Sequence, residues 1–297
     1  MRIRVRVLLA VVLVLAALPG ATRIVHKEQS LYRTILVTEE GSRVCLQFSV
    51  RREQKNQSCI NRNNPKRMVF TYTRMIMAAL LLQPSPDRIL VVGLGGGTLP
   101  TALRELLPEA DIDIVEIDPA VIRVAEVFFN FTATESMRVF TQDARVFTKR
   151  AAQRGDTYDL ILLDAYNGDY IPEHLMTKEY LEETKSLLTP GGVVAANTFA
   201  KSRLYAHESE TYLQVFGRLY NFKLPSSSNR IVLASNGPLP GRESLDAQAK
   251  FWKGKLKAYS IPISGYPALM SSEVDWDRST RPLTDQYSPA NLLQAQP

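Results

Sequence analysis

Two hydrophobic patterns divide the first third of the chain. From about residue 24 to residue 64, apolar and polar residues alternate and β-branched residues are frequent, as in RTILVTEE and RVCLQFSV. This alternation predicts a small antiparallel β unit. Residues Met68–Leu82 have the apolar spacing of a helix and predict a buried one. The next segment, Gln83–Asp87, contains two prolines, cannot continue a helix and is read as a linker.

From residue 88 onward, short apolar strands alternate with helical segments. The predicted strands are Arg88–Val92, Ile112–Glu116, Met137–Thr141, Tyr158–Leu163 and Gly192–Asn197, and the predicted helices are Thr98–Leu107, Pro119–Phe129, Ala144–Arg154, His174–Leu188 and Ala206–Tyr220. An antiparallel hairpin of Phe222–Leu224 and Arg230–Ala234 is expected at the edge. Strict alternation of this kind predicts an α/β fold with a Rossmann-like, doubly wound sheet.

The first 21 residues resemble a targeting segment. Three arginines lie within Met1–Arg6, and an apolar run follows at Val7–Leu18, ended by Pro19-Gly20. The run is short for a membrane-spanning helix, so a cleaved signal peptide and a retained membrane anchor both stay open. The arginines favour an exported, periplasmic body, although a domain on the cytoplasmic face is an alternative. We therefore divide the chain into a leader (1–21), a small β domain (22–66), a Rossmann-like nucleoside-binding transferase domain (67–236) and a C-terminal tail (237–297).

The two cysteines and the charge balance bear on the compartment and on possible partners. A hairpin turning near Arg52 would place Cys45 opposite Cys59, and in an exported protein the two would be expected to form a disulfide. The net charge is +6, with basic residues concentrated early in the chain. Because no nucleic-acid motif accompanies them, we read them as a solvated face and expect no nucleic-acid partner.

A glycine-rich turn is the centre of the candidate chemistry. Gly93, Gly95, Gly96 and Gly97 follow a strand and precede a helix, so that bare backbone and the free amides of a helix start can meet a ligand. A glycine loop alone is weak evidence, because several nucleotide-binding folds share it.

Carboxylates that end the next three strands sharpen this reading. Glu116 ends one strand and can accept hydrogen bonds from two ribose hydroxyls; Asp143, followed by Ala144, can read the amino edge of adenine; Asp164 ends the fourth strand. Each could merely cap a helix. All of them nevertheless fall at the carboxyl ends of strands, where open α/β sheets bind ligands, and together they predict a nucleoside site.

With these motifs in view, the chain resembles the spermidine synthase family of aminopropyltransferases, in its spermidine synthase-like branch. The resemblance runs from about residue 24 to residue 234 and includes the glycine loop, VEIDP, TQDAR and DAYNGDYIPEHL. It implies decarboxylated S-adenosylmethionine as co-substrate, no metal, a small-molecule amine such as putrescine as acceptor, and a homodimer. It further implies that Glu116 binds ribose, that Asp143 and Ala144 meet adenine, and that Asp164 is the catalytic proton acceptor. Tyr72, Asn167 and Asp169 would contact the amine.

The sequence also departs from the family pattern where the amine should bind. Gly96 and Asn167 each stand where family members carry an aspartate, Thr73-Arg74 replaces a His/Gln-Glu pair, and Arg33 replaces a glutamine. The pocket therefore loses negative charge.

Three hypotheses follow from the resemblance and these departures. The first is an aminopropyltransferase-like enzyme, and the second is a methyltransferase that uses S-adenosylmethionine with an unknown acceptor. The third is a non-catalytic, exported or membrane-associated binding module. His174 and His207 have no second ligand at metal spacing and are read as surface residues.

Overall fold

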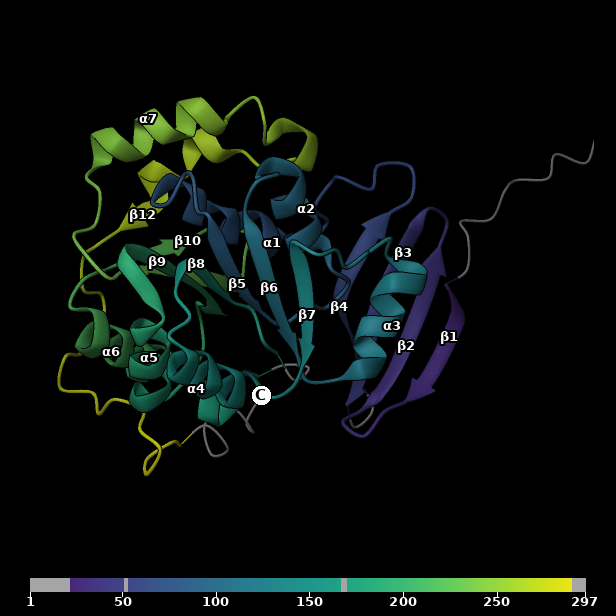
Figure 1. The fold of residues 1–297 in the computed structure, drawn as a ribbon, viewed down its shortest axis with the longest axis horizontal. Coiled ribbons are helices and arrows are strands. Elements are labelled where there is room, and N and C mark those ends of the chain that lie inside the picture. Colours follow the sequence, from purple (N-terminus) through teal and green to yellow (C-terminus); the bar gives the residue numbers. More distant parts are fainter. Residues whose placement is uncertain (1–21, 51–52, 167–169, 290–297) are drawn as a thin grey trace, which may run out of the picture.

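The structure is a computed structural model that describes residues 22–50, 53–166 and 170–289. The predicted leader lies outside these residues. Two β-sheets stand side by side, a small one near the N-terminus and a large one flanked by helices (Figure 1).

The small sheet is an antiparallel meander, as its alternating sequence predicts. Its strands are β1 (Arg23–Gln29), β2 (Thr34–Glu40), β3 (Arg43–Val50) and β4 (Glu53–Asn61), paired in chain order. Cys45 and Cys59 are directly opposite in the β3–β4 register and form a disulfide. The predicted placement of Cys45 opposite Cys59 in a hairpin is therefore confirmed.

The large sheet contains eight strands in the order β12-β10-β11-β9-β8-β5-β6-β7. Its parallel part consists of β5 (Arg88–Val92), β6 (Asp111–Glu116), β7 (Met137–Thr141), β8 (Tyr158–Leu163) and β9 (Leu188–Phe199). The antiparallel part consists of β10 (Leu219–Lys223), β11 (Asn229–Ser235) and the short β12 (Met270–Ser271). Within the parallel part, the chain runs from β5 outward through β6 to β7, and then crosses back to β8 on the other side of β5. The strand order thus reverses between β5 and β8, and a doubly wound sheet binds ligands at that point.

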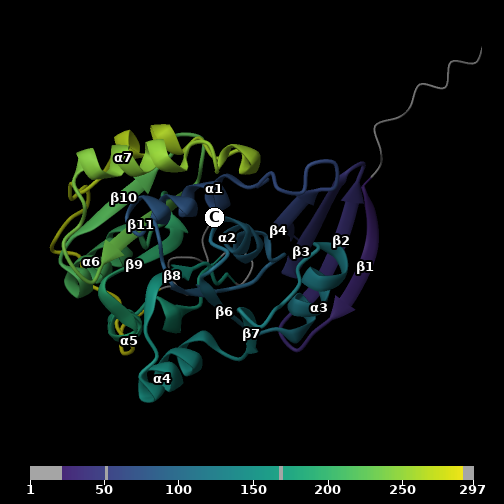
Figure 2. The ribbon, with the colours of Figure 1, turned by 45° about the horizontal axis from the view of Figure 1, so that its top comes forward.

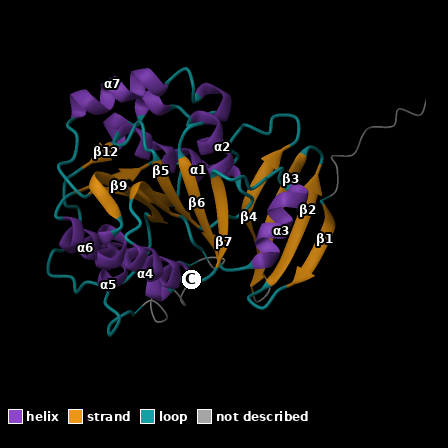
Figure 3. Ribbon diagram, in the orientation of Figure 1, coloured by secondary structure: helices purple, strands orange, loops and turns teal. Residues whose placement is uncertain are grey.

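Helices cover both faces of this sheet (Figures 1 and 3). One face carries α1 (Thr71–Ile76), the 3₁₀ turn Met77–Leu81, α2 (Thr98–Leu106) and α7 (Arg242–Trp252); the other carries α4 (Ala144–Arg154), α5 (Lys178–Ser186) and α6 (Tyr205–Phe216). The apolar residues of β5 divide between the two cores, Ile89 and Val91 to one and Leu90 and Val92 to the other. This is why the strand reads as a continuous apolar run.

Helix α3 (Pro119–Phe128) packs against both sheets, with Ala125 in the core of the large one. Ala120, Val121 and Val124 join Val37 and Leu46 in a third apolar cluster. The Ser30 hydroxyl also donates to Asp118, the buried N-cap of α3, at 2.6 Å. These contacts fix the small sheet beside the large one, as the tilted view in Figure 2 shows.

Three predictions about elements were wrong in detail. The expected helix Ala206–Tyr220 already ends at Phe216 as α6, and β10 begins at Leu219. The expected helix His174–Leu188 is a 3₁₀ turn, Glu173–Leu175, followed by α5, because the hydroxyl of Thr177 caps a new helix start. Pro190-Gly191-Gly192 lies inside β9, which already begins at Leu188. The C-terminal tail contains α7, and its Trp252 is buried in the core of the large sheet.

Candidate active site

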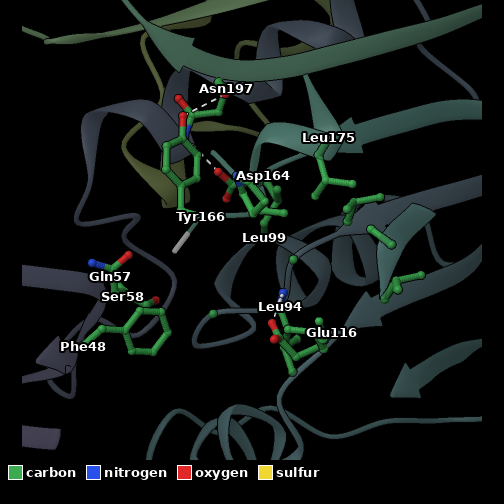
Figure 4. Close-up of a pocket in the computed structure, with 18 of the residues that line it drawn as sticks. Phe48, Gln57, Ser58, Leu94, Leu99, Glu116, Asp164, Tyr166, Leu175 and Asn197 are labelled. Carbon is green, nitrogen blue, oxygen red and sulfur yellow. Dashed lines mark hydrogen bonds between the residues drawn. The ribbon is translucent and has the colours of Figure 1, made fainter. Parts of the chain in front are cut away.

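A cleft of about 630 Å³ opens at the carboxyl ends of the parallel strands, between the small sheet and the large one (Figure 4). Gly93, Gly95 and Gly96 of the glycine loop line it together with Glu116, Asp143 and Asp164. Phe48, Asn56, Gln57 and Ser58 of the small sheet line it from the other side. The predicted strand-end residues therefore share one cavity.

Backbone packing explains why the loop after β5 must be glycine. Gly93 has φ +99°, and a Cβ there would collide with the main-chain carbonyl of Asp164. At Gly96 a Cβ would lie 2.7 Å from Ser58 Oγ and 2.8 Å from Phe129 Cδ1. The aspartate that the family pattern places at position 96 therefore has no room unless these side chains shift. Gly97 does not line the cleft; its α-carbon faces Phe131 and it caps α2.

Glu116 is held by main-chain amides beside the glycine loop. Its Oε2 accepts a hydrogen bond from the Leu94 amide at 3.1 Å, and its Oε1 accepts one from the Asp118 amide at 3.0 Å. Burial raises the pKa of this carboxyl group, against the effect of the two amides. Carboxylate oxygens can accept further hydrogen bonds, so Glu116 remains able to bind the two hydroxyls of a ribose.

Asp143 caps a helix and lines the cleft at the same time. It accepts from the Val146 amide at 3.0 Å as the N-cap of α4, and its second oxygen is 2.9 Å from His174 Nε2. The hydrogen bond to His174 is the main cause that lowers the pKa of Asp143. Asp143 thus caps a helix, as the sequence allowed, and the same side chain also lines the cleft, where it could bind a ligand. Ala144 lies next to it in the cavity wall.

Among the described carboxyl groups of this wall, Asp164 has the fewest hydrogen-bond partners. Its Oδ1 accepts a hydrogen bond from Asn197 Nδ2 at 2.8 Å. Burial raises its pKa to about 7, and the hydrogen bond from Asn197 only partly offsets this effect. A carboxyl group with a pKa near the ambient pH suits proton exchange with a reacting group.

Tyrosines border the cleft around Asp164. The Tyr166 hydroxyl donates to the Asn197 carbonyl at 2.8 Å, and the Tyr72 hydroxyl donates to the Gln57 carbonyl at 3.2 Å. Burial raises the pKa of both well above 10, so both stay neutral at physiological pH. Tyr72, predicted to contact the amine, therefore lies in the same cavity as Asp164.

Some cavity residues escaped sequence reasoning. Asn197 and Phe199 lie at the carboxyl end of β9. The argument that placed Asp164 in the site, that open α/β sheets bind ligands at the carboxyl ends of their strands, could have found them too. His174 was read as a surface residue, yet it pairs with Asp143 across 31 positions, which no local pattern reveals. Asn167 and Asp169 lie outside the described residues.

Within the described part of the chain, no group of three or more His, Cys, Asp or Glu residues could hold a metal ion. No helix there is both long and apolar enough to cross a membrane.

A doubly wound sheet with a glycine loop and strand-end carboxylates around one cleft defines a nucleoside-binding transferase fold. Residues 69–232 match the family model of the spermine/spermidine synthase domain. A polyamine aminopropyltransferase of Vibrio vulnificus is 50% identical over 277 residues, which cover 93% of each chain. The chain therefore belongs to the spermine/spermidine synthase family.

Two solved structures show the same fold. A probable spermidine synthase from Corynebacterium glutamicum aligns with a TM-score of 0.66 at 18% identity, over 87% of this chain and 98% of that one. Human methyltransferase-like protein 13, in complex with SAH, aligns with a TM-score of 0.57 at 25% identity, over 71% of this chain and 96% of that one. The predicted fold is confirmed.

Proposed function

We propose that the protein transfers an aminopropyl group from decarboxylated S-adenosylmethionine to a small-molecule amine. The observation that carries this proposal is the position of Asp164, a buried carboxyl group with a pKa of about 7, in the same cleft as Glu116 and the glycine loop. The polyamine aminopropyltransferase name of the Vibrio vulnificus relative supports it.

The reaction requires little of the protein beyond positioning and one proton acceptor. The amine nitrogen attacks the carbon next to the sulfonium, the new N–C bond forms as the C–S bond breaks, and the sulfur leaves as the neutral thioether of methylthioadenosine. The amine reaches the cleft as an ammonium and must lose a proton to attack. Asp164 in its ionised form accepts this proton. Glu116 would hold the ribose, and Asp143 and Ala144 the adenine, so that the reacting carbon faces the amine.

A product assay tests this function. The protein is mixed with decarboxylated S-adenosylmethionine and putrescine, and the products are identified by mass spectrometry. We expect methylthioadenosine and an aminopropylated amine in equal amounts. A reaction with neither product, for any amine tried, would contradict the proposal and favour a non-catalytic binding module.

A second candidate function is methyl transfer from S-adenosylmethionine. It is favoured by the likeness to human methyltransferase-like protein 13 in complex with SAH and by the absence of a carboxylate at Gly96, where Ser58 and Phe129 leave no room for one. The nucleoside product separates the two reactions: methyl transfer releases S-adenosylhomocysteine, whereas aminopropyl transfer releases methylthioadenosine.

We further propose that the domain matures in an oxidising compartment, behind a leader that is a signal peptide or a membrane anchor. The disulfide between Cys45 and Cys59 supports this placement, since such bonds persist mainly outside the cytoplasm. Sulfonium nucleosides are made in the cytoplasm, and this argues against an exported enzyme that uses them. Alkylation of freshly isolated protein should find both cysteines blocked; two free thiols would contradict an exported domain.

The homodimer expected from the resemblance is also a proposal, and measuring the mass of the protein in solution tests it.

A further inference from the structure

Arg33 places a positive charge in a cleft that should receive cations. It stands directly before β2, and its side chain lines the same cavity as Asp164 and Glu116. Its guanidinium lies over the Phe48 ring, 4.2 Å from the ring centre, so its orientation is fixed by stacking. Its Nη1 donates to the Tyr166 carbonyl at a long 3.4 Å. The carboxylates whose charges favour the protonated form of Arg33 are Glu116 and Asp118, so its guanidinium lies on the Glu116 side of the cleft.

This guanidinium has hydrogen-bonding capacity left over. Its Nε is buried and has no partner among the described residues. An unpaired buried donor is costly, and a guanidinium presents five N–H groups in a planar fork that matches a carboxylate. Arg33 lines the cavity in which the ligand would bind, so a ligand group that reaches the accessible edge of the guanidinium would be a natural acceptor for its N–H groups.

The other charges in the cleft fit a ligand that carries a negative group. Three carboxylates line its described wall, and two are already engaged: Glu116 by two amides, and Asp143 by His174 and a helix start. Of these three, Asp164 is the one left to face the sulfonium and the ammonium groups that the substrates bring. A simple diamine adds two positive charges beside Arg33, whereas an amine that also bears a carboxylate would pair with it.

We propose that Arg33 binds a carboxylate of a substrate. The inference rests on the proposed function only in assuming that the cleft holds a sulfonium nucleoside and an amine. The carboxylate has two possible sources, an acceptor that is an amino acid or a donor that keeps its α-carboxylate. Each source has a matched pair of probes that differ by that one group: ornithine and putrescine for the acceptor, S-adenosylmethionine and its decarboxylated form for the donor.

The acceptor arm measures kcat/KM for methylthioadenosine release with ornithine and with putrescine. We expect wild-type protein to prefer ornithine. Arg33→Gln should lower kcat/KM for ornithine by about tenfold or more, while that for putrescine stays equal or rises, because a charge-assisted bidentate contact is lost. Arg33→Lys should keep part of the preference. Arg23→Gln, in the same small sheet but exposed and paired with Glu39, is the matched control and should change neither value.

The donor arm measures the dissociation constants of the two sulfonium nucleosides by calorimetry. A preference for S-adenosylmethionine in the wild type that Arg33→Gln abolishes would assign the carboxylate to the donor. The inference is overturned if a folded Arg33→Gln protein, checked by its thermal melt, keeps the wild-type ratio for both pairs. This arm does not require turnover. Calorimetry with ornithine and putrescine in the presence of methylthioadenosine tests the acceptor in the same way, so failure of the transfer reaction would refute the proposed function and still leave Arg33 tested.

Discussion

Replacing Asp164 with asparagine separates the catalytic role of this residue from its cost to the fold. Burial raises the pKa of the Asp164 carboxyl from 3.8 to about 7, which corresponds to about 4 kcal/mol in favour of its neutral form. Between these two pH values the folded protein keeps a proton that the unfolded chain has released. Raising the pH through this window therefore destabilises the fold, and the full loss is reached above pH 7. Asparagine has nearly the shape of the neutral acid and does not titrate.

The expected gain in the free energy of unfolding of Asp164→Asn over wild type is about 4 kcal/mol at pH 8 and about 2 kcal/mol at pH 5. Glu208, whose pKa burial also raises to about 7, is common to both proteins, so its effect cancels. Urea titrations at the two pH values measure the difference. Turnover by the variant should fall about 10²- to 10⁴-fold because the proton acceptor is gone. Equal stability differences at both pH values, or undiminished turnover, would refute the reasoning.

Three further predictions concern the walls of the cleft. Gly93→Ala should abolish nucleoside binding and destabilise the fold, because its Cβ collides with the main chain of Asp164; Gly241→Ala, where a Cβ meets open space, is the control, and similar melts for both would contradict this account. Asp143→Ala should weaken methylthioadenosine binding in calorimetry and cost about 1 kcal/mol in stability as a lost helix cap; unchanged affinity would leave Asp143 a cap alone. Reduction of the Cys45–Cys59 disulfide should lower stability by about 3 kcal/mol, as expected for a loop of this size; identical urea midpoints with and without reductant would count against it.

Four of the five parallel strands could be predicted almost to the residue because each is a short apolar run with turn residues at both ends; β9 is longer than its prediction at both ends. Arg88–Val92, Met137–Thr141 and Tyr158–Leu163 have the predicted bounds. Strands of this kind are buried on both faces, so the sequence signal is strong. Because open α/β sheets bind ligands at the carboxyl ends of their strands, the sequence alone also predicted that Glu116 and Asp164 share one cleft.

The remaining features depend on contacts between distant parts of the chain. The two-residue strand Met270–Ser271 exists only because β10 offers it an edge, and no pattern of that length is distinctive. The pairing of His174 with Asp143 and the stacking of Arg33 on Phe48 likewise join separate elements. Sequence comparison with the family pattern could mark Arg33 as unusual, but only the fold shows that it lines the cleft.

The central claim is that the strand-end carboxylates and the glycine loop form a single nucleoside site. Calorimetric titration of methylthioadenosine into the wild-type protein and into Glu116→Gln tests it most directly. We expect one binding site per chain in the wild type and an affinity at least tenfold lower in the variant, since a neutral amide binds the ribose hydroxyls less strongly. No heat of binding in the wild type, or the same affinity in both proteins, would contradict the claim.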